Sequence, residues 1–299
     1  MFKNERGATY VVTVLAMTVI LGFFALVTDV GLTFIERRKL SNAADSAALA
    51  GALELPTDPD KALNVANEYL NKNNVSLDSF NISVSEDNSK IEVDVLTEVQ
   101  YYFAKVLGMD STDVASKAKA LVGPVSKVYD GIRPLVVEDQ TFEYGERFIL
   151  KEDGGDGYNG NYGAVALGGT GASNFRYNIK FGYKGKLEVG DIIDTETGNM
   201  AGPTRKGINY ITDSDYSTFE NFTKDSLRLW TIPIVDSLAV DGRDEVKIVG
   251  FALFFMEDAQ ENEANGQLEI VGRFIEFTTN GDISEGQTDY GLKGVKLTH

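Results

Sequence analysis

The sequence predicts an α+β protein with an N-terminal transmembrane helix, a helix packed on a small antiparallel sheet, and then a β-rich sandwich or barrel domain. Three observations predict this fold. Residues 8–28 carry no charge, residues 80–95 alternate apolar and polar side chains across a turn, and glycine-punctuated strands follow from about residue 126. We place an anchor at 1–30, an α+β unit at 31–125 and a β-rich domain at 126–299.

The uncharged segment 8–28 is long enough to cross a membrane. As a helix it extends about 31 Å, close to the roughly 30 Å hydrocarbon thickness of a bilayer. A core helix rarely runs this far without a charge, and a cleaved signal has a shorter apolar region followed closely by a cleavage site. Here Asp29 and the basic residues Arg37, Arg38 and Lys39 follow instead. We therefore expect one uncleaved span, whose orientation the flanking charges do not decide.

Local patterns predict the elements of the middle part. Helical spacing of small and apolar residues continues beyond the span, and Pro56 with Asp58 and Asp60 separates this helix from the next. Alternation around the Asp87-Asn88 turn predicts a hairpin. The predicted elements are a helix continuing to about residue 54, a helix at 60–74, strands at 80–84 and 91–95, a helical turn at 101–109 and a strand at 113–123.

In the last part, FRYNIKFGY at 175–183 alternates apolar and polar side chains, which predicts a strand. Residues 245–257 and 267–278 predict two neighbouring strands joined by the acidic segment 258–266. TGNMAGPT at 197–204 is typical of turns.

Composition excludes several function classes. The net charge is −17, and residues beyond 40 carry 23 basic and 42 acidic side chains, so nucleic-acid binding is not expected. The chain has no cysteine, and its one histidine is His299, which argues against thiolate and histidine chemistry and against metals held by these residues. Nucleophile-elbow and P-loop motifs are absent from the sequence. We expect no catalytic residue and no cofactor.

The sequence from residue 29 onward resembles a known family. Asp-Val-Gly at 29–31, followed by ERRKLSNAADSAALAGA at 36–52, resembles the TadE/TadG-like proteins of the Flp/Tad pilus-assembly system. Those proteins carry an N-terminal span, an Asp-x-Gly, a basic cluster and an Asn-Ala-Ala-Asp helix. Residues 99–123 resemble a further element of this family, and residues 159–169 and 189–208 resemble the C-terminal region of longer members.

The resemblance implies a membrane-anchored, pseudopilin-like and non-enzymatic component of a bacterial pilus-assembly machine, with a pilin-like helix on its sheet. It implies a cytoplasmic N-terminus, a body outside the cytoplasm, and other pilus-assembly or pseudopilin proteins as partners. Two departures matter. Asp215 replaces the first serine in the nearest match (DSDYS, 213–217) to the Asp-x-Ser-x-Ser metal site that larger TadG proteins often carry. Gly7 fits prepilin cleavage, but Val12 stands where those substrates have glutamate.

Several residues are candidates for membrane or partner contact. A carboxylate at a membrane boundary can pair with a partner helix or lie in the headgroup region, and a nearby basic cluster can bind anionic lipid or remain solvated. A stripe of alanines can form a seam between subunits or pack in its own domain. The candidates are Asp29, Arg37, Arg38, Lys39, Ala43, Ala44, Asp45, Ala47 and Ala48.

One loop has the composition of a calcium site. Asp153, Asp156, Asn159 and Asn161 lie in a glycine-rich stretch, and oxygen ligands on a flexible backbone suit Ca²⁺. Their spacing does not match an EF-hand, so the sequence favours a plain turn and no metal. Two other function classes remain open: a tethered β module for adhesion or glycan binding, and an envelope hydrolase that uses paired carboxylates.

Overall fold

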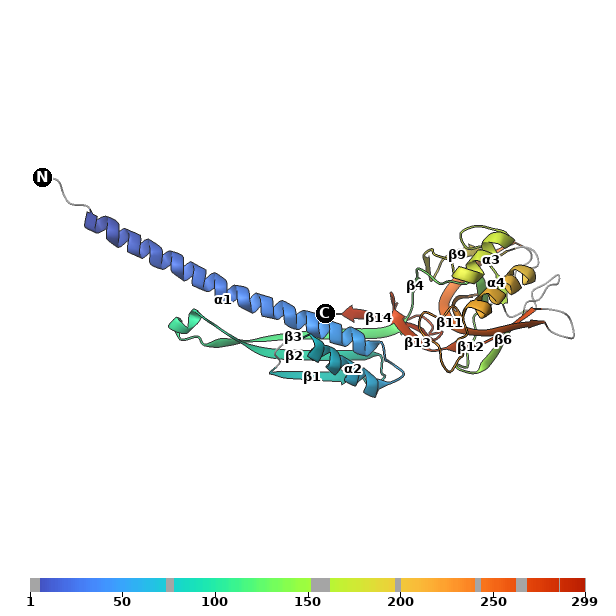
Figure 1. The fold of residues 1–299 in the computed structure, drawn as a ribbon, viewed down its shortest axis with the longest axis horizontal. Helices are drawn as coiled ribbons and strands as arrows, with labels where there is room; N and C mark the ends of the chain where they lie inside the picture. The colour runs from blue at the N-terminus through green and yellow to red at the C-terminus, as the bar shows by residue number, and fades with distance from the viewer. Residues whose placement is uncertain are drawn as a thin grey trace. The chain divides into compact units, whose positions relative to one another are not determined.

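The computed structural model describes residues 6–73, 78–151, 162–196, 200–239, 243–261, 268–284 and 286–298. The chain divides into two compact units. Unit 1 comprises Met1–Leu121 and Leu297–His299, and unit 2 comprises Val122–Lys296. The predicted α+β class is confirmed: one long N-terminal helix precedes a chain rich in strands (Figure 1).

Helix α1 (Arg6–Ala52) has two parts that differ in burial. Its large apolar side chains from Tyr10 to Val30 are 53–72% exposed, whereas Leu40 and five of the alanines that follow are fully buried: Ala43, Ala44, Ala47, Ala48 and Ala52. In the second part the helix contacts its neighbours closely. A Cβ added at Gly51 would lie 2.7 Å from the Ile91 side chain.

Unit 1 packs the second part of α1 and a shorter helix, α2 (Pro59–Lys72), with an antiparallel sheet. Asp58 starts α2 by accepting the Lys61 backbone N–H at 2.8 Å, which satisfies one of the free donors of the first turn. The sheet has the order β1 (Ser79–Val84), β2 (Lys90–Gln100) and β3 (Ser111–Pro124), with the 3₁₀ turn η1 (Ala104–Leu107) between β2 and β3. The predicted hairpin, third strand and helical turn are therefore confirmed.

Unit 2 is built on a curled sheet (Figure 1). β10 pairs with β11 antiparallel and with β5 in parallel, and β9 adds to β11 beside this path. The sheet order is β6 (Arg147–Lys151), β12 (Leu268–Ile275), β11 (Glu245–Glu261), β10 (Leu229–Val235), β5 (Leu135–Glu138) and β7 (Tyr162–Ala164), with β9 at Ile192–Asp194. Outside it, β4 (Lys127–Val128) pairs with β8 (Leu187–Glu188), and β13 (Phe277–Asn280) with β14 (Leu292–Thr298).

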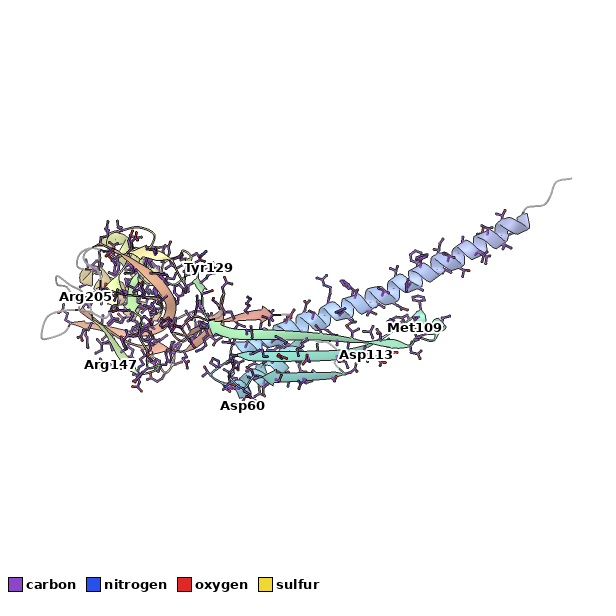
Figure 2. All side chains as sticks on the ribbon, turned by 180° about the vertical axis from the view of Figure 1, so that it is seen from behind. Asp60, Met109, Asp113, Tyr129, Arg147 and Arg205 are labelled. Carbon is purple, nitrogen blue, oxygen red and sulfur yellow. The ribbon has the colours of Figure 1, made fainter. Side chains whose placement is uncertain are left out.

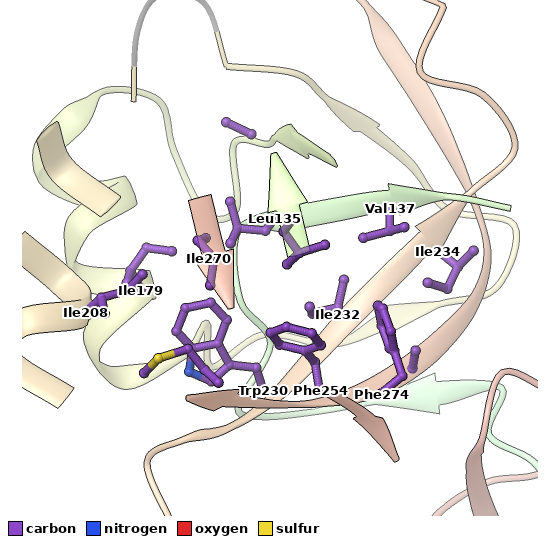
Figure 3. Close-up of a cluster of buried hydrophobic side chains, with 14 of the residues drawn as sticks. Leu135, Val137, Ile179, Ile208, Trp230, Ile232, Ile234, Phe254, Ile270 and Phe274 are labelled. Carbon is purple, nitrogen blue, oxygen red and sulfur yellow. The ribbon is translucent and has the colours of Figure 1, made fainter. Parts of the chain in front are cut away.

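The sheet of unit 2 has apolar side chains on both faces. One face packs against α3 (Ala172–Phe181) and α4 (Ala201–Ser214), where Trp230 and Phe254 are fully buried (Figure 3). Burying large aromatic side chains is the main apolar contribution to such a core. The two neighbouring strands predicted at 245–257 and 267–278 are β11 and β12.

The strand predicted at 175–183 is wrong, because residues 175–181 belong to α3. Phe175, Asn178 and Ile179 are buried, which is the i, i+3, i+4 spacing of a helix face. Phe175 and Ile179 occur in both the helical and the alternating pattern, so the sequence alone does not distinguish a helix from a strand here. Tyr177 and Phe181, which a strand would have placed on that same face, are 53% and 42% exposed.

The turn predicted at 197–204 is also wrong in its second half. Gly202 and Pro203 lie in the first turn of α4, where proline is tolerated because the first backbone N–H groups of a helix have no intrahelical partner. Residues 197–199 lie outside the described residues.

Candidate membrane anchor

The exposed part of α1 has the chemistry of a helix in lipid. Among the described residues, α1 is the helix long and apolar enough to cross a membrane, and its most apolar window is not buried in the protein. Thr13, Thr18 and Thr28 each donate their hydroxyl to the backbone carbonyl four residues earlier, at 2.8–2.9 Å. These bonds satisfy polar groups inside the helix, as a hydrocarbon environment requires. The exposed part of α1 is therefore suited, by length and composition, to anchor the body that follows in a membrane.

Asp29, directly after the uncharged segment, holds a distant segment of unit 1. Its Oδ1 accepts the backbone N–H of Tyr102 at 2.9 Å, and its Oδ2 accepts those of Phe103 at 3.0 Å and Ala104 at 2.7 Å. The residue is only 4% exposed. Asp29 thus contacts its own chain, at the start of η1, rather than a basic side chain.

No local sequence pattern predicts the contact of Asp29 with residues 102–104. The three donors lie at or just before the start of η1, where backbone N–H groups have no intrahelical partner, and a carboxylate is a favoured acceptor for such groups. The partners are more than 70 positions apart, so no local pattern connects them. An isolated Asp at the boundary and a predicted helical turn at 101–109 were the only available signals.

Replacing Asp29 by asparagine should loosen this contact. The new amide would keep the shape of the side chain but offer one acceptor oxygen for three N–H groups, and it would lose the charge that strengthens the bonds. We expect Asp29→Asn to increase amide hydrogen exchange of residues 102–104 several-fold, measured by mass spectrometry in detergent. The exchange of β1 should not change. Equal exchange at 102–104 in both proteins would contradict the assigned contact.

The basic cluster lies exposed on α1. The side chains of Arg37, Arg38 and Lys39 are all exposed, and Lys39 Nζ lies 2.6 Å from Glu36 Oε1. At about 1.5 Å per residue, Arg37 is about 12 Å along the helix from Asp29. Lipid contact by this cluster stays a prediction.

The alanine stripe lies inside unit 1. Ala43, Ala44, Ala47 and Ala48 are fully buried, where α1 packs against α2 and β2. The domain-core alternative for this stripe thus has direct support in the burial, whereas a seam between subunits would need these side chains accessible. Asp45, on the same helical segment, is half-buried.

The structure supplies no metal site among the residues that it describes. No group of three or more His, Asp or Glu side chains there is placed to hold an ion. The calcium loop considered for Asp153, Asp156, Asn159 and Asn161 lies outside the described residues.

Asp215, in the string that was compared with a metal site, organises a loop instead. Its Oδ1 accepts the Ser217 backbone N–H at 2.9 Å, and its Oδ2 accepts the Ser226 hydroxyl at 2.6 Å and the Leu227 N–H at 2.8 Å. Burial raises the pKa of the Asp215 carboxyl, but these hydrogen bonds outweigh it and lower the pKa to about 2.

This shift predicts an acid-dependent contribution to stability. A carboxyl with a depressed folded-state pKa stabilises the fold above its unfolded-state pKa of about 4, and this stabilisation is lost as the pH falls toward about 2. Asp215→Asn should therefore lower the Tm by a few degrees at neutral pH and flatten the fall of Tm between about pH 4 and pH 2. Thermal melts at both ends of this range test it, and parallel pH profiles of the two proteins would contradict it.

Unit 2 also contains a groove of about 820 Å³ with mixed charge. Arg133 lines it, is 3% exposed, and donates to the carbonyl oxygens of Asn178 at 3.3 Å and Leu227 at 3.1 Å. Its guanidinium also lies 5.7 Å from the centre of the Trp230 ring. These contacts hold the Arg133 guanidinium in place.

The comparison with protein families concerns α1. Residues 7–54 match the Tad family, which is described as "Putative Flp pilus-assembly TadE/G-like". The resemblance to Tad proteins is confirmed over this segment. The Tad segment contains the exposed part of α1, Asp29, the basic cluster and the alanine stripe, and it ends just beyond α1. No curated protein and no solved structure gives a significant match to the chain.

Proposed function

We propose that this protein is a non-enzymatic, pseudopilin-like component of Flp/Tad pilus assembly, held in the cell membrane by α1 with its body outside the cytoplasm. The observation that carries the proposal is the Tad match, which coincides with α1 nearly from end to end. The match supports a part in pilus assembly and interaction with other pilus components.

The architecture of unit 1 supports the same proposal. One helix provides both an exposed apolar part, suited to lipid, and a buried alanine-rich part that packs on an antiparallel sheet. This is the pilin-like arrangement that the resemblance implies. Small side chains let the second part of α1 approach α2 and β2 closely. Because α1 is one continuous helix, it connects the exposed apolar part directly to the body.

Deleting the gene in the native host tests this proposal. We expect surface pili, counted by electron microscopy and measured by immunoblot of sheared filaments, to fall strongly and to return with the wild-type gene. A gene carrying Tyr216→Ala, a change at a side chain that is 83% exposed, should restore them equally. Unchanged pili in the deletion strain would contradict the proposal.

A second candidate function, adhesion or glycan binding by the tethered β-rich unit, is favoured by one observation. Tyr177, Phe181 and Tyr210 form an exposed aromatic cluster on α3 and α4, with ring centroids 4.9 and 5.3 Å apart. Lys180 Nζ lies 4.5 Å from the Tyr210 ring, and Phe181 also lines the groove. Exposed aromatic faces offer apolar contact to the C–H faces of sugar rings.

A glycan array probed with the detergent-solubilised chain tests this second candidate. If the cluster binds sugar, Tyr177→Ala should weaken binding by roughly tenfold, whereas Tyr216→Ala, at an exposed tyrosine outside the cluster, should not. An array without binding, or equal effects of the two substitutions, would remove this candidate.

A further inference from the structure

The loop between β2 and β3 exposes an unusual number of apolar side chains. We call residues 101–109 the hairpin tip. Within it, Tyr102 is 72% exposed, Phe103 49%, Val106 90% and Met109 51%. Figure 2 labels Met109 at the end of this hairpin. Contiguous exposed apolar side chains of this kind mark a contact surface in soluble units.

The hairpin tip lies level with the end of the membrane-spanning segment. Asp29 follows the last uncharged residue of the span and binds the backbone of residues 102–104 at 2.7–3.0 Å. Two lengths agree with this placement. At about 1.5 Å per helical residue, α1 extends about 33 Å from Gly51 to Asp29, and at about 3.3 Å per strand residue the chain from Ile91 to Tyr102 extends about 36 Å. The β2–β3 hairpin therefore runs alongside α1 as far as the membrane boundary.

The turns at the two ends of strand β2 differ in chemistry. The turn between β1 and β2, at the other end of β2, is the polar sequence Glu86-Asp87-Asn88-Ser89. The hairpin tip instead combines two tyrosines, a phenylalanine and a methionine with Lys105. Aromatic side chains concentrate at the headgroup level of membranes, and a lysine there can extend its ammonium toward water. The apolar end is the one that Asp29 holds at the boundary.

We propose that the hairpin tip inserts into the lipid headgroup interface beside α1 and forms a second membrane contact of unit 1. A single helix leaves the tilt of the attached body free, whereas two contacts fixed to each other through Asp29 restrict it. The occupant is lipid because the hairpin tip lies beside the end of the membrane-spanning segment, where Asp29 holds it. α1 itself exposes Val30, Phe34 and Ile35 just beyond Asp29. The inference requires that α1 spans a membrane, and it depends neither on the direction of insertion nor on a role in pili.

Fluorescence in vesicles tests the proposal. The chain has no cysteine, so Val106→Cys creates a single attachment site for the environment-sensitive dye NBD. Glu86→Cys provides the matched control in the polar turn between β1 and β2, and Tyr102→Cys provides a second position in the hairpin tip. The labelled full-length proteins are reconstituted into vesicles of equal parts phosphatidylcholine and phosphatidylglycerol. Lipids with a nitroxide in the headgroup or deep in the acyl chain then quench the dye according to its depth.

We expect dyes at 106 and 102 to be blue-shifted and quenched several-fold more than the dye at 86, with headgroup nitroxide quenching best. Equal quenching at 106 and 86 would overturn the proposal. Shielding of the dye at 106 that arises only when a second pilus-assembly protein is added would also overturn it, because the hairpin tip would then contact protein. The vesicle experiment uses purified protein and does not depend on pili. A failure of the lipid-contact proposal can therefore be distinguished from a failure of the proposed role in pilus assembly.

Discussion

Ala44→Lys is expected to destroy the cooperative unfolding transition of unit 1. Ala44 is fully buried where α1 packs against α2 and β2, so a lysine there would place an ammonium group in an apolar, close-packed interior. Burying an unpaired charge and overfilling a packed site together cost at least about 3 kcal/mol, a large part of the roughly 5–15 kcal/mol that stabilises an ordinary domain.

The measurement is a thermal melt of the full chain in detergent, with Asn42→Lys as the matched control. Asn42 lies two residues away on the same helix and is exposed, so a lysine there should leave the melt within about 0.5 kcal/mol of the wild type. An unchanged melt of Ala44→Lys, combined with loss of pili in cells, would show that the alanine stripe is an assembly seam rather than core.

Removing residues 1–28 is expected to transfer the protein from the membrane fraction to the soluble fraction while both units stay folded. The deletion removes most of the exposed apolar part of α1 and retains Asp29, so the hairpin tip keeps its acceptor. The alanine stripe and the core of unit 2 remain intact. Spanning helices hold a protein in the bilayer far more firmly than a surface contact does, so the change in partition should be nearly complete.

Fractionation and a thermal melt of the truncated chain check this expectation. The full-length protein should remain with membranes after a high-salt or carbonate wash, which releases proteins bound only at the surface. A truncated chain that aggregates, or that lacks a cooperative melt, would show that the span contributes to the folding of unit 1.

The sequence predicted unit 1 well because its signals are local. Alternation from Phe80 to Val95, the Asp87-Asn88 turn and the Asp58 cap each act within a few residues, and all appear in the structure. In unit 2 the residues of α3 were predicted as a strand, because Phe175 and Ile179 fit a strand and a helix equally well. Packing against α4, through contacts such as Ile179 with Gly207, decides for the helix.

The candidate site was predicted in composition but not in arrangement. Asp29 and the alanine stripe were singled out from the sequence, yet the acceptor role of Asp29 depends on a contact between residues 29 and 102–104 that only the folded chain brings together. The sequence likewise predicted a helical turn at the hairpin tip, but no local pattern indicates that this turn lies beside the end of the span.

The side of the membrane on which the body lies is the most direct test of the account. Lys184 is exposed in unit 2, so Lys184→Cys would introduce a single accessible thiol into a chain without cysteine. A membrane-impermeant maleimide should label this thiol on intact cells, whereas a thiol introduced by Asn4→Cys should react only after lysis. Labelling of Asn4→Cys on intact cells with protection of Lys184→Cys would place the body in the cytoplasm and contradict a role at the cell surface.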